Sequence, residues 1–382
     1  MVDSHEDSDV STVTRDASEG SEASDPHVVV VACGGTIASE PGDGGAAPAK
    51  TGDDLVAAVP GIEAYATVSS REVCSQPGFD VRWRDVFATA SAVREAVAGG
   101  ADGVVVTHGT DTLADTAFAL DLLTDLPAPV VVTGAQRRLD EPSSDVAANL
   151  TLAVRAAADD RFAAGVHVAF DDELHAARDA VKTHTNALST FRSPGTGPVA
   201  TFTRSGSRVL REPCRAVGGD PLDVAEAADA VDATDVAGES DADAGAFADR
   251  NNAGPVPEVP VIHSGTGVGA EGIEAAVARG VGGLVIEGTG LGNATAAIGD
   301  AVAEAVEDVP VVVASRAHAG ATEPVYGTPG GAVTLDAHGV VFADDLPASK
   351  ARVALALGVA AGLDREDLPE LFRAPGRASP IR

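Results

Sequence analysis

Two segments decide the fold: V-V-V-V-A-C-G-G-T-I-A at residues 28–38 and V-V-V-T-H-G-T-D-T at residues 104–112. In each, a run of valines leads directly into glycine and threonine. Uninterrupted β-branched runs are typical of strands buried on both faces, as in the parallel sheet of an α/β domain. A strand that ends in Gly and Thr presents a hydroxyl and free backbone N–H groups at one edge of its sheet. The two segments therefore predict an α/β domain with a polar site at the strand ends.

The chain around these segments alternates between strand and helix patterns. Further strands are expected at 130–133 and 166–170, a closing hairpin at 199–202 with 208–210, and helices at 55–59, 86–98, 113–123 and 146–158. This alternation predicts a doubly wound, mainly parallel sheet.

A second, shorter strand–helix series begins at Val259. Strands are expected at 259–263, 283–287 and 311–315, and helices at 273–278, 297–306, 350–357 and 366–372. The preceding stretch is rich in Ala, Asp and Gly, and we expect it to be an extended linker with a marginal helix at 222–231. The predicted domains are a disordered acidic tail at 1–26, an N-terminal catalytic α/β domain at 27–212, the acidic linker at 213–258 and a smaller C-terminal α/β domain at 259–382.

The chain is strongly acidic. Its 382 residues include 58 Asp and Glu against 26 Lys and Arg, a formal net charge of −32, and only three of the cations are lysines. Residues 1–26 contribute −7 and residues 220–258 contribute −10, so the remainder lies on the folded domains. Such a surface repels nucleic acid and anionic membranes. We expect a halophilic protein adapted to a molar-salt cytoplasm, where the Debye length is about 3 Å. The alternative is an ordinary acidic protein with two disordered acidic segments.

Other features of the whole chain exclude several classes of protein. No apolar stretch reaches the length of a membrane helix, and residues 1–26 lack the apolar region of a signal peptide, so a soluble cytoplasmic protein is expected. The three cysteines, Cys33, Cys74 and Cys214, have neither the even number of a disulfide framework nor metal-ligand spacing. Cys33 and Cys74 lie close in sequence to candidate site residues, and we expect them to be small buried residues.

Four polar side chains are expected at the carboxyl edge of the first sheet: Thr36, Thr110, Asp111 and Lys182. Ligands of open α/β sheets bind at this edge, near the point where the strand order reverses. A threonine hydroxyl needs a base or a neighbouring cation to become a nucleophile, and a Thr–Asp–Lys group can supply one. The glycines before Thr36 leave N–H groups free for an oxyanion. Simpler alternatives are a phosphate-binding turn, a helix cap at 110–112 and a solvent-exposed lysine.

The same residues resemble the two signatures of the bacterial and archaeal L-asparaginases, T-G-G-T-I-A and H-G-T-D-T. Here they read C-G-G-T-I-A at 33–38, with Cys33 in place of the usual threonine, and H-G-T-D-T at 108–112. The resemblance continues through 73–76, 144–149, 181–183, 288–293 and 346–352, and it covers most of residues 27–372 outside the linker. It implies a larger N-terminal and a smaller C-terminal α/β domain.

The resemblance also implies a reaction and its catalytic residues. Thr36 matches the acylated nucleophile, and Thr110, Asp111 and Lys182 match the triad thought to activate a nucleophile or the attacking water. The implied reaction is hydrolysis of L-asparagine to aspartate and ammonia through a threonine acyl-enzyme. No metal or organic cofactor is implied.

The remaining implied roles concern substrate binding. Ser75 and Gln76 match the pair that holds the α-carboxylate and α-ammonium of the substrate, and Asp111 also faces the ammonium. Asn293 matches a segment that is contributed across an intimate dimer. The implied assembly is a homodimer or homotetramer with its sites at subunit interfaces.

One departure from the family concerns the lid over the site. Members commonly carry a tyrosine on a mobile loop about a dozen residues beyond the nucleophile. Here residues 40–51 are rich in Gly, Ala and Pro, and no tyrosine occurs before Tyr65. Either the Thr110–Asp111–Lys182 group carries more of the proton transfer, or another subunit supplies the missing group.

Three alternative functions stay open. The amidase subunit of archaeal tRNA-dependent amidotransferase shares these motifs, but it carries a folded β domain before the first signature, for which residues 1–26 are too short and too acidic. Its work with tRNA also conflicts with a net charge of −32. Glutaminase activity is a close alternative, because one methylene changes discrimination by only about 1–3 kcal/mol. A catalytically silent amino-acid-binding module has no use for a nucleophile and a base.

Overall fold

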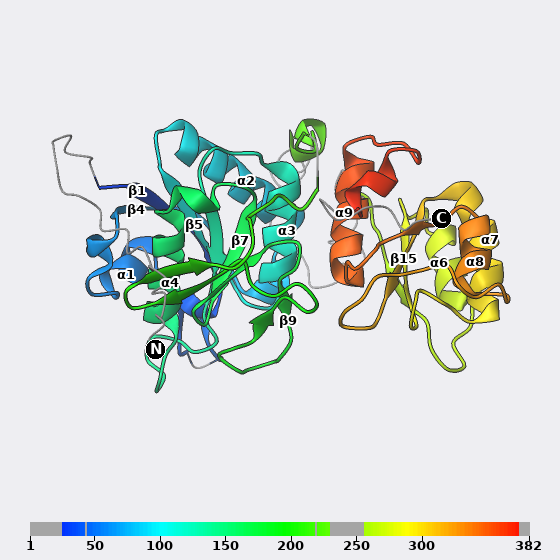
Figure 1. The fold of residues 1–382 in the computed structure, drawn as a ribbon, viewed down its shortest axis with the longest axis horizontal. Coiled ribbons are helices and arrows are strands. Elements are labelled where there is room, and N and C mark those ends of the chain that lie inside the picture. The colour runs from blue at the N-terminus through cyan, green and yellow to red at the C-terminus, as the bar shows by residue number, and fades with distance from the viewer. Residues whose placement is uncertain (1–24, 43, 218–219, 230–255, 374–382) are drawn as a thin grey trace, which may run out of the picture.

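The chain folds into two α/β units, which Figure 1 shows from blue to green and from yellow to red. The computed structural model describes residues 25–42, 44–217, 220–229 and 256–373. The expected tail, apart from residues 25 and 26, and the middle of the expected linker at 230–255 lie outside the described residues.

The N-terminal unit is built on an eight-stranded sheet. Its strands, in spatial order, are β12 (Gly206–Val209), β11 (Ala200–Thr203), β8 (Glu173–Ala176), β7 (Val166–Phe170), β6 (Val130–Thr133), β5 (Gly103–Thr107), β1 (His27–Gly34) and β4 (Thr67–Gln76). The strands from β7 to β4 pair in parallel, and β8, β11 and β12 continue the sheet antiparallel. The predicted mainly parallel α/β sheet is confirmed.

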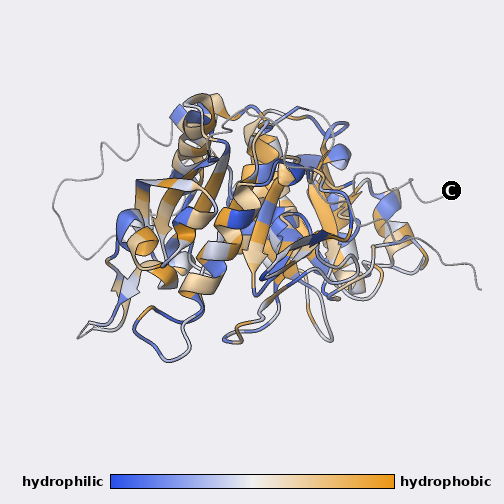
Figure 2. Ribbon diagram, turned by 60° about the vertical axis from the view of Figure 1, so that its left-hand side comes forward, coloured by the Kyte–Doolittle hydropathy of each residue, from blue (hydrophilic) through white to orange (hydrophobic). Residues whose placement is uncertain are grey.

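Helices on both faces bury the valine runs of this sheet. They are α1 (Gly52–Ala57), α2 (Trp83–Ala98), α3 (Leu113–Leu123) and α4 (Val146–Ala157), with 3₁₀ turns η1 (Thr36–Ala38), η2 (Ile62–Ala64), η3 (Gly78–Asp80) and η4 (Asp160–Phe162). Val104 and Val106 of β5 pack with α2 and α3, whereas Val105 packs with α1 and α4. Figure 2 shows the apolar residues concentrated in the strands and on the inner faces of the helices. Burying one valine side chain contributes about 1.5–3 kcal/mol, so both helix layers stabilise the sheet.

The strand order places a switch point between β1 and β5. From β1 the chain crosses to β4 on one side, and it later returns to β5 on the other side. The connections after β1 and β5 therefore leave in opposite directions, which opens a crevice beyond their carboxyl ends. The two glycine–threonine segments of the sequence lie at this crevice.

The C-terminal unit is a smaller parallel sheet of four strands. Its elements are β13 (Val261–His263), α6 (Glu271–Ala278), β14 (Leu284–Gly288), α7 (Ala296–Asp308), β15 (Val311–Ser315), α8 (Ala332–Ala337), β16 (Val341–Phe342), α9 (Ala348–Ala360) and η5 (Leu368–Leu371). Helix α9 lies between the two units, where it packs against α3 and against β14 and β15 (Figure 1). One apolar core therefore runs through both units. Across the described ranges, no helix is both long and apolar enough to cross a membrane.

Several regions differ from the sequence expectations: β8, α8 and β16 were not expected, and two further differences concern the N-terminal unit. Strand β4 was not expected, because four consecutive polar residues, Ser69 to Glu72, interrupt its apolar pattern. The stretch expected as linker begins along the N-terminal unit: the Ala216 N–H donates to the buried Asp121 carboxylate, and the Leu222 N–H donates to the Leu122 carbonyl at 2.9 Å. Residues 225–229 are helical.

Candidate active site

Three backbones touch at the carboxyl edge between β1 and β5. A Cβ built on Gly35 would lie 2.3 Å from Gly109 Cα, and a Cβ built on Gly109 would lie 2.4 Å from Gly78 Cα. Gly34 is equally close to β4, since its Cβ position is 2.7 Å from the Gln76 carbonyl oxygen. Gly35 also has φ 82°, in the region that favours glycine. Only hydrogen fits between these segments, so the glycines allow the contact.

This glycine junction, formed by Gly35, Gly78 and Gly109, gathers several of the predicted residues. Those that flank it are Thr36, Ser75, Gln76 and Thr110. Hydrogen bonds hold the segments together: the Gly35 N–H donates to the Gln76 carbonyl at 3.0 Å, and the Thr112 hydroxyl donates to the Gly78 carbonyl at 2.6 Å. The Ser75 residue is exposed and Gln76 is half-buried, so both side chains are accessible to a small ligand.

Lys182 contacts both members of the second motif. Its Nζ donates to Thr110 Oγ1 at 2.9 Å and to Asp111 Oδ1 at 2.8 Å. Thr110 is buried, whereas the Asp111 side chain is 54% exposed and the Lys182 side chain 18% exposed. Because the Thr110 oxygen accepts from Lys182, its own O–H proton is free for another acceptor. The structure thus brings Thr110, Asp111 and Lys182 together as one hydrogen-bonded group.

An open hollow of about 290 Å³ adjoins this group. It is lined by Asp111, Lys182, Thr183, His184 and Thr185. Helix α3 begins at Leu113, immediately beyond the group, and its N-terminus carries a partial positive charge. Within the described residues, no acceptor binds the backbone N–H groups of Thr110 and Asp111. The N-terminus of α3 and Lys182 bring positive charge to this edge of the sheet, and the Asp111 carboxylate brings negative charge to the same hollow.

A short hairpin anchors the backbone of Lys182. Lys182 ends β9 (Val181–Lys182), which pairs antiparallel with β10 (Phe191–Arg192). Phe191 is fully buried, and its ring centroid lies 4.9 Å from that of Phe170. Thr183 adds two bonds to the Thr190 carbonyl, from its N–H at 2.8 Å and from its hydroxyl at 2.9 Å. The long lysine side chain therefore extends from a fixed base.

Thr36 is half-buried at the start of η1. Its hydroxyl has no hydrogen-bond partner within the part of the chain that the structure describes. The turn before it is held by Ser39, whose hydroxyl donates to the Gly35 carbonyl at 2.8 Å. A free hydroxyl on a fixed turn at the switch point is suited to attack a bound substrate.

The segment expected as a lid forms a small hairpin. Strand β2 (Ser39–Glu40) pairs with β3 (Ala47–Pro48), and Lys50 pairs with Glu40 at 2.6 Å. Neither of the two tyrosines of the chain lies in this hairpin. Tyr65 instead lies beneath the Arg155 guanidinium, whose Cζ is 5.3 Å from the centroid of the Tyr65 ring. Tyr326 belongs to the C-terminal unit.

Asn293 is placed apart from these residues. It lies on the turn after β14, where its Oδ1 accepts the Ala332 N–H at 3.0 Å and its carbonyl accepts the Thr289 N–H at 2.7 Å. Its side chain thus holds the start of α8, and none of its contacts among the described residues involves the Thr110–Lys182 group. Its role across a subunit interface stays a prediction.

The cysteines near the site are packed rather than free. Cys33 is fully buried, with Sγ 3.2 Å from Thr89 Oγ1, and the Cys74 thiol donates to the Cys33 carbonyl at 3.8 Å. A hydrogen bond between the two thiols raises the pKa of Cys33 and lowers the pKa of Cys74, and burial adds to the rise at Cys33. Among the described residues, no cluster of three or more His, Cys, Asp or Glu side chains could hold a metal ion.

Several supporting residues were quoted in the sequence only as parts of motifs. His108 is buried against the junction, with Nδ1 2.8 Å from the Gly109 carbonyl, and burial lowers its pKa. Asn149 donates to the Gly134 carbonyl at 3.0 Å and to Asp145 at 3.0 Å, which fixes the loop after β6. The contact of Asn149 with the Gly134 carbonyl, 15 residues earlier, left no signal beyond the motif itself.

Comparison with known proteins agrees with the two-unit architecture. Residues 27–215 match the family described as "Asparaginase, N-terminal", and residues 258–372 match "Glutaminase/Asparaginase C-terminal domain". Together these matches cover most of the chain.

The similar proteins fall into two groups, named as asparaginases and as amidotransferase subunits. A probable L-asparaginase of Deinococcus radiodurans is 34% identical over 356 residues, 92% of this chain and 98% of that protein. One subunit of the glutamyl-tRNA(Gln) amidotransferase of Methanothermobacter thermautotrophicus is 34% identical over 330 residues, 84% of this chain and 69% of that protein. The crystal structure of a probable cytoplasmic L-asparaginase from Campylobacter jejuni matches with a TM-score of 0.75 and 27% identity, covering 91% of this chain and 99% of that one. The chain therefore belongs to the asparaginase/glutaminase family.

Proposed function

We propose that this protein is an L-asparagine amidohydrolase with Thr36 as its nucleophile. The observation that carries the proposal is the contact of Lys182 with both Thr110 and Asp111, beside the glycine junction that fixes Thr36. A pure binding module needs no such arrangement of a free hydroxyl next to a Thr–Asp–Lys group.

The proposed reaction proceeds in two steps. Thr36 Oγ attacks the side-chain carboxamide carbon, and its proton passes through the Thr110–Asp111–Lys182 group to the departing nitrogen, which leaves as ammonia. The oxyanion of the intermediate is stabilised by backbone N–H groups and by the N-terminus of α3. Water then attacks the threonine ester; the same group takes up a proton from the water and returns it to the departing Thr36 oxygen, which releases aspartate and free Thr36.

The proposed substrate-binding roles are those that the family resemblance implies. Ser75 and Gln76 at the end of β4 would hold the α-carboxylate and α-ammonium, with Asp111 also facing the ammonium. Asn293 would act in the site of a second subunit, in a homodimer or homotetramer. We further propose a cytoplasmic, halophilic enzyme of asparagine breakdown, supported by the net charge of −32.

Ammonia release from asparagine and from glutamine, measured in molar KCl, tests the reaction. Thr36→Ala should lose turnover while retaining its melting temperature, and Thr36→Ser, which keeps a hydroxyl, should retain part of it. Near-wild-type turnover in Thr36→Ala would refute the role of Thr36.

The 34% identity to an amidotransferase component favours a second candidate function, amide hydrolysis as part of a glutamyl-tRNA(Gln) amidotransferase. The same assay separates the two. Glutamine hydrolysis that depends on added glutamyl-tRNA(Gln) and partner subunits, with little release from free asparagine, would identify the amidotransferase role. Rapid release from free asparagine identifies the hydrolase.

A further inference from the structure

The turn at residues 177–180 connects β8 to β9 and ends two residues before Lys182. Ala177 and Ala180 are fully buried. The turn is closed by the N–H groups of Asp179 and Ala180, which both donate to the Ala176 carbonyl, at 2.9 and 3.0 Å. Buried carbonyls of such a turn need partners from elsewhere in the fold, because an unpaired one costs free energy.

One side chain of the C-terminal unit supplies these partners. Lys350 lies in the first turn of α9, and its Nζ donates to the carbonyls of Ala177 at 2.7 Å, Arg178 at 2.8 Å and Ala180 at 2.6 Å. An ammonium has three N–H bonds, so its donors are fully used. Lys350 is 1% exposed, and its Nζ lies 5.7 Å from the centroid of the Phe118 ring.

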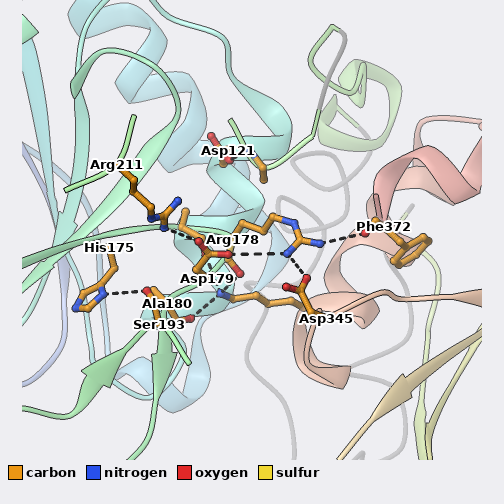
Figure 3. A network of polar contacts seen from close by, with 12 residues as sticks. Asp121, His175, Arg178, Asp179, Ala180, Ser193, Arg211, Asp345 and Phe372 are labelled. Carbon is orange, nitrogen blue, oxygen red and sulfur yellow. Dashed lines mark hydrogen bonds and ion pairs between the residues drawn. The ribbon is translucent and has the colours of Figure 1, made fainter. Parts of the chain in front are cut away.

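The same turn also donates hydrogen bonds in the other direction, from one of its own side chains to the C-terminal unit. Figure 3 shows the Arg178 guanidinium directed at the C-terminal unit, where it donates to Asp345 at 2.6 Å and to the Phe372 carbonyl at 3.1 Å. The neighbouring Asp179 faces back into its own unit and pairs with Arg211 at 2.5 Å. The turn is therefore held by both units, and the C-terminal one binds its backbone as well as its side chain.

The burial of Lys350 makes its three hydrogen bonds geometrically demanding. Burial lowers the pKa of Lys350, whereas the carboxylates of Asp115 and Asp179 raise it and favour the ammonium that makes three hydrogen bonds. A buried cation adds little to stability even when every hydrogen bond is made, but it demands one geometry from its acceptors. Here that geometry fixes three carbonyls of one four-residue turn.

We propose that Lys350 is a positioning residue for Lys182. By fixing the 177–180 turn from the C-terminal unit, it sets the base of β9 so that Lys182 Nζ reaches both Thr110 and Asp111. The role of Lys182 itself rests on the proposed function. Amide hydrolysis then requires the C-terminal unit of the same chain to be docked on the site-bearing unit.

The test uses the full chain in molar KCl with Lys350→Met, which keeps the length of the side chain and removes its donors. Two quantities are measured: kcat and KM for asparagine, and the rate at which an N-hydroxysuccinimide ester acetylates Lys182 relative to Lys50. The chain has only three lysines, so mass spectrometry assigns each product without overlap. We expect kcat to fall roughly 10²-fold, as for a displacement of about 1 Å in a catalytic group. KM should change less, and the Lys182-to-Lys50 ratio should rise severalfold.

Arg365→Met is the matched control. Arg365 also donates to backbone carbonyls, those of Val306 and Glu307, but within the C-terminal unit alone. It should leave both kcat and the acetylation ratio at the wild-type level. If Lys350→Met does not fold, Arg178→Met serves instead and should raise the ratio in the same direction.

The outcomes separate the two proposals. A folded variant with wild-type kcat and ratio overturns the positioning role, and so does a fall in kcat with an unchanged ratio, because Lys182 has then not moved. If the wild type hydrolyses neither asparagine nor glutamine, the proposed function fails. The acetylation ratio still decides whether Lys350 fixes Lys182.

Discussion

Replacing Gly109 by alanine is expected to disable the site by separating two backbones. The added Cβ would lie 2.4 Å from Gly78 Cα and 2.5 Å from Gly78 N, whereas ordinary contacts begin at 3.4 Å. The clash is with main-chain atoms, so no side chain can rotate to relieve it. The segments must therefore move apart by about 1 Å, the difference between the required and the available distance.

This displacement acts directly on the site residues. Gly78 follows the end of β4, which carries Gln76, and Gly109 immediately precedes Thr110. On the proposed roles, a shift of about 1 Å between the substrate-holding segment and the catalytic group costs on the order of 10²-fold in rate. Overpacking costs about 1–3 kcal/mol in the free energy of unfolding, so the protein should still fold.

Ammonia release and thermal unfolding would be measured for Gly109→Ala beside Gly206→Ala. A Cβ on Gly206 meets no atom within 4 Å, so that control should match the wild type in both. If Gly109→Ala retains wild-type kcat/KM, the strand ends tolerate the separation and the reasoning from the glycine junction is wrong.

Three further predictions concern catalysis, pH and salt. Lys182→Met should lower kcat roughly 10²- to 10⁴-fold with little change in melting temperature. The control Arg71→Met, which breaks an exposed ion pair, should leave kcat unchanged. Equal kcat values in the two variants would contradict the role of Lys182. Burial lowers the pKa of His167 to about 3, so between pH 6.5 and 3 the unfolded chain binds a proton that the folded chain does not, and stability falls as the pH falls. From pH 7 to pH 5, His167 should lower the free energy of unfolding by about 2 kcal/mol, a loss that is absent in His167→Leu. Denaturant unfolding of both proteins at the two pH values measures this difference. The same pH dependence in both proteins would refute it. Lowering KCl from molar concentration to about 0.1 M lengthens the Debye length from about 3 to about 10 Å, so a chain with net charge −32 should lose several degrees of melting temperature. An unchanged melting temperature would remove the proposed salt adaptation.

The valine runs made much of the fold predictable. β5, β6 and β15 lie where runs such as Val311–Val313 predict strands, because strands buried on both faces leave a continuous apolar signature. Strand β4 left no such signature, since one of its edges and part of its faces are exposed to solvent. Yet β4 carries Ser75 and Gln76, the proposed substrate-holding pair, so the missed strand belongs to the proposed site.

The sequence motifs named the residues of the candidate site, but they did not predict which of these residues contact one another. Motifs identified Thr110 and Lys182, but their hydrogen bond joins positions 72 residues apart, which no local pattern encodes. Gly78 lies outside both signatures, and its close contact with Gly109 follows from the tertiary arrangement alone. Lys350 lies in the 346–352 segment of the resemblance, but only its burial, 1% exposed, and its contacts with the 177–180 turn reveal its part in the fold.

The late position of Lys350 bears on when the protein becomes active during synthesis. Lys350 is 173 residues beyond Ala177, the first carbonyl that it binds. At about 5–20 residues per second, the site-bearing unit is made about 9–35 s before the residue that fixes its lysine. On the proposed role, unfinished chains still attached to the ribosome hydrolyse the substrate at least about 10²-fold more slowly than the complete chain, so activity rises only as synthesis ends.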